Sequence, residues 1–327
     1  MSSLPKQIIK YLGEDWLIVQ NKIREGLKSD IDLLNRTNDS LLEHTGKQLR
    51  PILSLLVSKA CSTESLTDLS HRYAAATELL HNATLLHDDV ADRSESRRGY
   101  PTIMSLMGPG VAVLLGDYWL VKAMEQVLGP GETDSETIRI FSKTLSDLAV
   151  GEMLQLEKAN ECDTTEEDYL RIIYSKTASL FETAAVSAAL SVKASKEVVE
   201  AVREYAVFLG YAFQIKDDIL DYVGNNFVGK PIGVDILEQK ITLPLLGALA
   251  SVSKQEEAKI REKVKNVTEE SKAEIITFIK ENGGVEYSLN RIEEYVSKAI
   301  DALNVLPESQ EKAYLVELAY YAGRRLK

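Results

Sequence analysis

Helical periodicity is the feature of this sequence that most constrains its fold. Apolar residues recur at spacings of three and four along almost every long segment, and almost no segment alternates strictly between apolar and polar residues. This pattern predicts an all-α protein. The expected helices cover residues 5–27, 51–61, 66–92, 101–106, 110–128, 134–158, 165–190, 196–223, 241–252, 254–266, 268–281, 283–304 and 308–325.

The breaks between these helices are short. The clearest are Gly129-Pro130-Gly131, residues 160–165 and residues 224–233, where glycine, proline, asparagine and acidic residues favour turns. None of them is long enough for an interdomain linker. We therefore predict a single domain over residues 1–327, with the highly charged segment 253–280 as its solvated margin.

Composition and charge exclude several classes of function. With 38 Lys+Arg against 50 Asp+Glu, the net charge is −12, and no basic stripe is present that would favour nucleic acid. Cys61 and Cys162 form no CxxC pair, and no apolar run reaches the roughly 18 residues that a membrane span needs. Acidic residues interrupt the N-terminal segment where a signal peptide has its apolar core. We expect a cytoplasmic location.

Two segments share an aspartate pattern: LLHDDVAD at residues 85–92 and FQIKDDILD at residues 213–221. On a helix, Asp88 and Asp92 lie within about 40° of each other and about 6 Å apart along the axis. Asp217 and Asp221 have the same spacing. Like charges so placed destabilise a helix, and more so when apolar neighbours partly bury them. A cationic partner is therefore expected at each aspartate set.

Either salt bridges on a solvated face or divalent metal ions could supply that positive charge. The presence of two copies, each at the end of an otherwise apolar helix, favours metal. Carboxylate clusters prefer Mg²⁺ or Mn²⁺, and Mg²⁺ commonly shares its coordination sites with substrate phosphates. Each nearby cation, taken alone, is typical of an ordinary surface residue, but together with the aspartates they suggest two diphosphates. These cations are Lys47, Arg50, Arg97, Arg98, Lys176, Lys230 and Lys240.

Seven segments in order along residues 46–246 resemble the motifs of the trans-isoprenyl diphosphate synthases, the polyprenyl synthetase family. They are GKQLRP (46–51), ELLHNATLLHDDVADRSESRRGYPT (78–102), LLGDYWL (114–120), GEMLQL (151–156), YSKTASLFE (174–182), FQIKDDILDYVG (213–224) and GKPIGVDILEQKITLPLL (229–246). The resemblance implies an all-α terpenoid synthase fold, with helices around a deep central cavity, and a homodimer.

The resemblance also implies roles for individual residues. Asp88 and Asp92, with Asp89 beside them, form the first Mg²⁺ set, and Asp217 is the main ligand of the second, with Asp218 and Asp221 supporting it. The aspartates Asp88, Asp89, Asp92 and Asp217, together with Lys176, are the implied catalytic residues. The allylic diphosphate is held by Arg97, Lys176, Thr177, Gln214, Lys230 and Lys240. Isopentenyl diphosphate is held by Lys47, Arg50, His81 and Arg98.

The implied reaction is the Mg²⁺-dependent, sequential head-to-tail (1′-4) addition of isopentenyl diphosphate to an allylic diphosphate primer. In the family, the residues four and five before the first aspartate limit product length, and here they are the small Thr84 and Ala83. We therefore expect a long product, hexaprenyl to decaprenyl. A deeper floor around Ile140 and Phe141 would instead give a farnesyl or geranylgeranyl product. Arg324 and Lys327 match a C-terminal flap, and the role of Lys216 stays open.

Three other classes of protein share parts of this sequence pattern. The Glu78-x-x-His81 spacing is typical of a di-iron bundle, but His44, His71 and His87 supply no second copy. A terpene cyclase would not need both aspartate sets or the cations that hold isopentenyl diphosphate. A non-catalytic scaffold subunit would be expected to have lost one aspartate set, and here both are intact.

Overall fold

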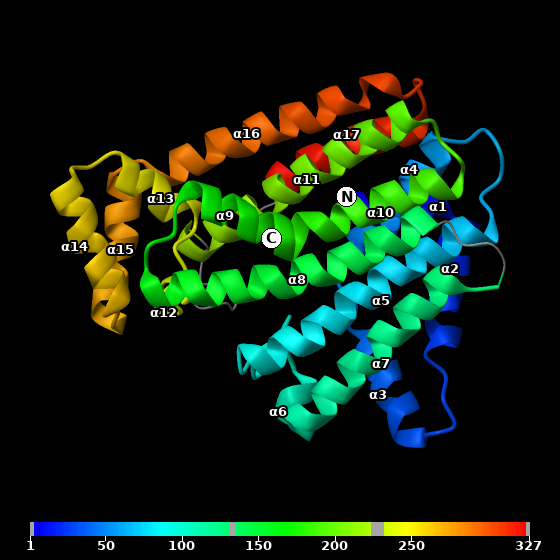
Figure 1. Ribbon diagram of the computed structural model, residues 1–327, viewed down its shortest axis with the longest axis horizontal. Coiled ribbons are helices and arrows are strands. Elements are labelled where there is room, and N and C mark those ends of the chain that lie inside the picture. The colour runs from blue at the N-terminus through cyan, green and yellow to red at the C-terminus, as the bar shows by residue number, and fades with distance from the viewer. Residues whose placement is uncertain (1–2, 131–134, 224–231, 325–327) are drawn as a thin grey trace. The chain divides into compact units, whose positions relative to one another are not determined.

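The computed structural model describes residues 3–130, 135–223 and 232–324. Within these ranges the chain is helical apart from turns, loops and one pair of two-residue strands (Figure 1). The all-α prediction is therefore confirmed. No helix in the described ranges has both the length and the apolar character needed to span a bilayer.

Two compact units make up the chain, and each is described by itself. The first comprises Met1–Ser142, Thr183–Val202 and Val305–Leu315, and the second comprises Lys143–Glu182, Arg203–Asn304 and Val316–Lys327. Four helices contribute residues to both units: α8 (Ser135–Glu161), α10 (Ser179–Ser191), α11 (Lys196–Val223) and α17 (Gln310–Arg324). The single domain expected over residues 1–327 stays a prediction.

A long buried helix, α5, organises the first unit. The helices that lie wholly in this unit are α1 (Leu4–Leu12), α2 (Glu14–Gly26), α3 (Asp32–Glu43), α4 (Leu49–Ala60), α5 (Asp68–Ala91), α6 (Ile103–Met107) and α7 (Pro109–Leu128). Helix α5 packs against α2, α4 and α7, and α7 lies beside it (Figure 1). Every residue from Ser70 to Leu80 is buried, as expected for a helix that is covered on all sides.

The N-terminal part of the first unit differs from the sequence prediction. The single helix expected over residues 5–27 is two helices, because Gly13 adopts φ +54° and ends α1. Helix α3 was not predicted. It buries the polar side chains of Thr37 and Asn38 instead of an apolar stripe, and Asn38 accepts a 2.8 Å hydrogen bond from Trp119 Nε1. Apolar periodicity could not reveal such a helix.

A tight hairpin, also not predicted, follows α5. Strand β1 (Ser96–Arg97) pairs antiparallel with β2 (Tyr100–Pro101). Arg98 and Gly99 form the two-residue turn with φ values of +55° and +84°. Positive φ at both central positions is the requirement of a type I′ turn, whose twist matches that of the two strands. The turn therefore fixes where Arg97 and Arg98 leave the chain.

The second unit is built around the apolar helix α13, in which Leu243–Leu249 are all buried. Helix α13 packs against α14, α15 and α16, and α14 lies beside α15 (Figure 1). Helices α14 and α15 bury two residues each, as expected for the charged margin. The helices that lie wholly in this unit are α9 (Glu166–Ile173), α12 (Val234–Leu237), α13 (Leu243–Ala250), α14 (Lys254–Lys265), α15 (Glu269–Glu281) and α16 (Gly284–Ala302). A π-helical turn, η1 (Tyr174–Ala178), follows α9, and a 3₁₀ turn, η3 (Leu303–Val305), follows α16.

Candidate active site

The first aspartate set lies at the C-terminal end of α5. Asp88 and Asp89 occupy its last turn and Asp92 is its C-cap. Asp92 is exposed and Asp88 is half-buried, whereas Asp89 is only 5% exposed. Arg97 Nε, from the hairpin, donates a 2.8 Å hydrogen bond to Asp89 Oδ1. The middle aspartate is thus held by the protein, and Asp88 and Asp92 lie nearer to solvent.

The environment of Asp89 disfavours its charge despite this ion pair. Burial raises the pKa of Asp89 above its usual range, although the Arg97 guanidinium opposes that shift, and the Asp92 carboxylate raises it further. Arg97 itself keeps a 35% exposed side chain beside the set. The hairpin therefore presents a cation where the two outer aspartates reach solvent.

Two of the cations predicted for isopentenyl diphosphate, Arg50 and Arg98, lie near His81 in the same unit. Burial lowers the pKa of His81 well below its usual range, and the charges of Arg50, Arg98 and Arg97 lower it further. The imidazole is therefore neutral among three guanidinium groups. Arg50 is 8% exposed, and Lys47 is exposed just before α4.

Gly46 makes room for this cluster. A β-carbon built on Gly46 would lie 2.5 Å from the Arg98 guanidinium, so a side chain there would displace it. Buried Glu78 lies near the same groups, and burial raises its pKa while the charges of Arg50 and Arg98 lower it. The structure thus brings Arg50, His81 and Arg98 together.

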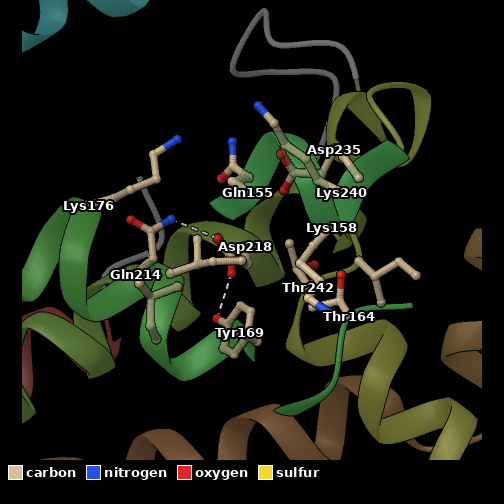
Figure 2. A pocket seen from close by; sticks show the side chains of 14 residues that line it. Gln155, Lys158, Thr164, Tyr169, Lys176, Gln214, Asp218, Asp235, Lys240 and Thr242 are labelled. Carbon is tan, nitrogen blue, oxygen red and sulfur yellow. Dashed lines mark hydrogen bonds between the residues drawn. The ribbon is translucent and has the colours of Figure 1, made fainter. Parts of the chain in front are cut away.

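The second aspartate set lies in the last two turns of α11. Asp217 is exposed, Asp218 is 5% exposed and Asp221 is half-buried. Two donors hold the Asp218 carboxylate: Tyr169 donates to Oδ2 at 2.6 Å, and Gln214 Nε2 donates to Oδ1 at 2.8 Å (Figure 2). Burial raises the pKa of Asp218, the charges of Asp217 and Asp221 raise it further, and these two hydrogen bonds oppose the shift.

Asp221 anchors the segment that leads to Lys240. Its Oδ1 accepts the N–H of Val234 at 3.2 Å and its Oδ2 accepts the N–H of Asp235 at 3.1 Å. The Gly233 N–H also bonds the Asp221 carbonyl at 2.8 Å. Both carboxylate oxygens therefore carry backbone partners, which connect α11 directly to α12.

A π-helical turn carries Lys176 and Thr177. The helix expected over residues 165–190 widens here from α9 into η1 and then continues as α10. Thr177 donates a 2.7 Å hydrogen bond to Gln214 Oε1, and Lys176 pairs with Glu152 at 2.5 Å. Single π turns of this kind are common at functional sites.

Two glycines let neighbouring helices approach the π turn. A β-carbon on Gly151 of α8 would lie 2.5 Å from Ser175 Cβ, and one on Gly210 of α11 would lie 2.5 Å from Ala178 Cα. Contacts that short do not occur, so both positions require glycine if the turn is to stay where it is. The turn is thereby held between α8 and α11.

One cavity of about 170 Å³ lies in the second unit, and the side chains of Tyr169, Gln214 and Asp218 are among those that line it (Figure 2). Lys158, Lys176 and Lys240 line it together with Asp218 and Asp235. Its size is close to that of an engineered cavity of about 150 Å³ that holds one benzene molecule. It can therefore hold a polar head group, but not a long isoprenoid chain.

The donor groups fit a hard divalent cation. Burial raises the pKa of Asp235 well above its usual range, and the charges of Asp218 and Asp221 raise it further, so these carboxylates repel one another. Oxygen ligands of this kind are those that Mg²⁺ prefers. Among the described residues, no three His, Cys, Asp or Glu side chains are arranged to hold a metal ion by themselves. A Mg²⁺ ion here would need water or substrate oxygens to complete its coordination, as is usual for this ion.

Some predicted residues are less well placed by the structure, and two were missed. Lys230 and Lys327 lie outside the described residues. Arg324 ends α17 on the surface over the Tyr320 ring, and Lys216 is buried. Sequence reasoning assigned no role to Tyr169 or Asp235. Tyr169 comes two helical turns before Lys176, on the same helical face, which was the available signal.

Comparison with known proteins settles the family. The sequence profile described as "Polyprenyl synthetase" matches residues 31–281. The chain belongs to the polyprenyl synthetase family. An octaprenyl diphosphate synthase of Haemophilus influenzae is 36% identical over 322 residues, covering 98% of this chain and 96% of the relative. An all-trans-nonaprenyl-diphosphate synthase of Rhodobacter capsulatus is also 36% identical, covering 98% of each.

Solved structures agree with this membership. A decaprenyl diphosphate synthase of Rhodobacter capsulatus matches with a TM-score of 0.91 at 32% identity, covering 99% of both chains. A polyprenyl synthase of Caulobacter crescentus, complexed with calcium and isoprenyl diphosphate, matches with a TM-score of 0.89 at 32% identity, covering 98% of both chains. As a member of the polyprenyl synthetase family, this chain is a prenyltransferase with the all-α terpenoid synthase fold, as the sequence predicts.

Proposed function

We propose that this chain extends an allylic diphosphate by successive additions of isopentenyl diphosphate and releases a long all-trans polyprenyl diphosphate. One observation carries the proposal: Lys176, Gln214, Asp218 and Lys240, all predicted from the sequence, line one cavity in a member of the polyprenyl synthetase family. The cations provide sites for a diphosphate, and the aspartates provide hard ligands for a divalent ion.

Residues of the second unit hold the allylic diphosphate. Lys176 and Lys240 neutralise the charge that builds on the leaving diphosphate as its carbon–oxygen bond breaks, which eases ionisation. Thr177 and Gln214 orient the head group. Mg²⁺, when bound, supplies further positive charge at the leaving oxygens.

Residues of the first unit hold isopentenyl diphosphate. Lys47, Arg50 and Arg98 bind its diphosphate, and the neutral His81 offers a ring nitrogen for a hydrogen bond. Binding both substrates to one protein replaces a bimolecular encounter with an intramolecular one. The double bond of isopentenyl diphosphate attacks the allylic cation, and a proton is then lost to the released diphosphate.

We propose that Mg²⁺ binds each aspartate set, with Asp88 and Asp92 as the main protein ligands in the first set and Asp217 as the main ligand in the second. Support comes from the exposure of Asp92 and Asp217 and from the engagement of Asp89 and Asp218 by other side chains. A calcium ion accompanies isoprenyl diphosphate in the Caulobacter crescentus relative, and Ca²⁺ is likewise a hard cation that takes oxygen ligands.

The proposed product is long, from hexaprenyl to decaprenyl. Ala83 is fully buried and Thr84 is half-buried on α5, and neither carries a bulky side chain. Relatives named for octaprenyl and nonaprenyl products are 36% identical over 98% of the chain, while a short chain isoprenyl diphosphate synthase of Methanothermobacter thermautotrophicus is 33% identical over 94% of it. Mass spectrometry of the dephosphorylated products distinguishes the two outcomes.

We further propose that the enzyme is a homodimer that pairs through α7. This helix exposes Leu114, Val121 and Leu128 at 71%, 54% and 51%. The three residues are spaced by seven and so lie on one helical face. An apolar face of this kind favours a partner over solvent.

The direct test is an incorporation assay. Radiolabelled isopentenyl diphosphate is incubated with the protein, Mg²⁺ and either farnesyl or geranylgeranyl diphosphate, and the extracted lipid is counted. Label in the extract supports the proposal. A protein that incorporates none under any of these conditions is not the synthase proposed here.

A further inference from the structure

Tyr169 lies outside every motif that suggested the function, yet its hydroxyl makes one of the shortest side-chain contacts to the second aspartate set. The side chain is 2% exposed, and its hydroxyl donates to Asp218 Oδ2 at 2.6 Å. We propose that Tyr169 is a positioning residue: it fixes Asp218, and through it Gln214 and Thr177, in the orientation that receives the allylic diphosphate. This inference rests on the function proposed above.

The hydrogen bonds around Asp218 form a chain with a defined direction. Tyr169 donates to one carboxylate oxygen and Gln214 Nε2 donates to the other at 2.8 Å, so both oxygens are engaged. The Gln214 amide must then turn its oxygen away from Asp218, and that oxygen accepts the Thr177 hydroxyl at 2.7 Å. A single amide orientation satisfies all three bonds.

This chain also connects two backbone segments at two points. Tyr169 and Thr177 belong to α9 and the π turn, whereas Gln214 and Asp218 are one turn apart on α11. Removing the Tyr169 hydroxyl would leave Asp218 Oδ2 buried without its donor, which is unfavourable. The carboxylate would then rotate toward another donor, and Gln214 would turn with it. Thr177 would lose the partner that orients its hydroxyl.

A purely structural role for Tyr169 must be separated from this one, since a buried ring also packs. Tyr287 provides a matched control in the same unit, because its hydroxyl donates to Glu166 Oε2 at the same distance of 2.6 Å. Neither Tyr287 nor Glu166 lines the cavity. Tyr287→Phe therefore removes the same kind of hydrogen bond without touching the chain that ends at Thr177.

The experiment compares Tyr169→Phe with Tyr287→Phe by calorimetric binding of farnesyl thiodiphosphate, an unreactive allylic analogue, in the presence of Mg²⁺. Loss of a partner that orients a metal or substrate ligand typically weakens binding about 10- to 100-fold, and we expect a loss in that range for Tyr169→Phe. We expect Tyr287→Phe to bind the analogue like the unchanged protein. The KM for isopentenyl diphosphate should be the same in all three proteins.

One further measurement keeps the outcomes distinct. The loss caused by Tyr169→Phe should largely disappear in a Gln214→Ala background, because the chain is already broken there. The inference is overturned if Tyr169→Phe binds the analogue as tightly as the unchanged protein, or if the variant weakens the binding of both substrates equally. It is also overturned if the loss of affinity persists in full in the Gln214→Ala background. If the unchanged protein binds no analogue, the proposed function fails and the inference fails with it.

Discussion

The π turn that carries Lys176 and Thr177 gives the sharpest prediction, through the substitution Gly210→Ala. Gly210 lies on α11, where an added β-carbon would be 2.5 Å from Ala178 Cα and 2.6 Å from Ala178 Cβ. Ala178 is the last residue of the π turn and directly follows Thr177. The backbone of the turn is therefore the part of the molecule that has to move.

The size of that movement follows from the contact distances. Carbon atoms pack best at about 3.5–4.0 Å, so the turn has to retreat by about 1 Å. Overpacking of this kind costs roughly 1–3 kcal/mol, and replacing a helical glycine by alanine returns roughly 0.5–1 kcal/mol. Stability should fall by about 1 kcal/mol. A 1 Å misplacement of a substrate-binding group can reduce the rate about 100-fold, so activity should suffer far more than folding.

The assay measures kcat/KM for the allylic diphosphate, at saturating isopentenyl diphosphate, beside a thermal melt. Gly110→Ala in α7 is the matched control, because a β-carbon there meets no atom within 4 Å. We expect Gly110→Ala to keep full activity. If Gly210→Ala is folded and turns over the allylic substrate at the normal rate, the position of the π turn does not determine substrate binding and the reasoning is wrong.

Four other substitutions test separate parts of the proposal. Ala83→Phe should shorten the product, because a bulky ring fills the small site on α5, and an unchanged product profile in mass spectrometry would disprove that role. Leu114→Glu should make the protein monomeric in light scattering if the proposed dimer forms through α7, since it places a charge on the exposed apolar face of that helix. A variant that stays dimeric would exclude this face. Asp221→Asn should raise the KM for the allylic diphosphate about 10-fold, because Asp221 holds the backbone N–H groups of Val234 and Asp235, and it should leave the Mg²⁺ activation midpoint unchanged. Asp217→Asn should raise that midpoint. Equal shifts of the midpoint in the two variants would make Asp221 a metal ligand instead.

The sequence could identify those candidate site residues that lie at a regular helical spacing. The repeated aspartate pattern correctly predicted that both sets lie at the C-terminal ends of helices, α5 and α11. The basic residues near Gly46 were likewise expected at the start of a helix, which is α4. Arg98 and His81 prove to be neighbours because the hairpin returns the chain toward α4. That return depends on positive φ at Arg98, a non-glycine residue, and nothing in the local sequence announces it.

Other features depend on contacts between distant segments, and periodicity carries no information about those. Helix α3 buries Asn38 to bond Trp119, which lies 81 residues away. The π turn arises inside a segment that is apolar enough for an uninterrupted helix, and it is revealed only by its contacts with Gly151 and Gly210. Tyr169 was missed for the same reason, since its partner Asp218 is 49 residues away.

The two aspartate sets share a buried middle residue, although their outer residues differ: Asp92 and Asp217 are exposed, whereas Asp88 and Asp221 are half-buried. Asp89 and Asp218 are both 5% exposed, and each accepts a hydrogen bond from outside the motif, from Arg97 and from Tyr169 respectively. On a helix, the middle position is rotated by about 100° from the first, so it faces inward when the first faces solvent. The inner aspartate can therefore fix the helix end while its neighbours bind ligand.

The donors to the inner aspartates differ, and so should their responses to substitution. Arg97 is a cation that offsets the charge of Asp89, and it remains 35% exposed, so it can also reach a diphosphate. Tyr169 is neutral and buried, and it can only orient Asp218. Removing the first donor changes the net charge at its site, whereas removing the second changes geometry alone. The loss of substrate affinity caused by Arg97→Gln should therefore shrink as the salt concentration rises, because salt screens the charge that this variant removes. The loss caused by Tyr169→Phe should be the same at all ionic strengths.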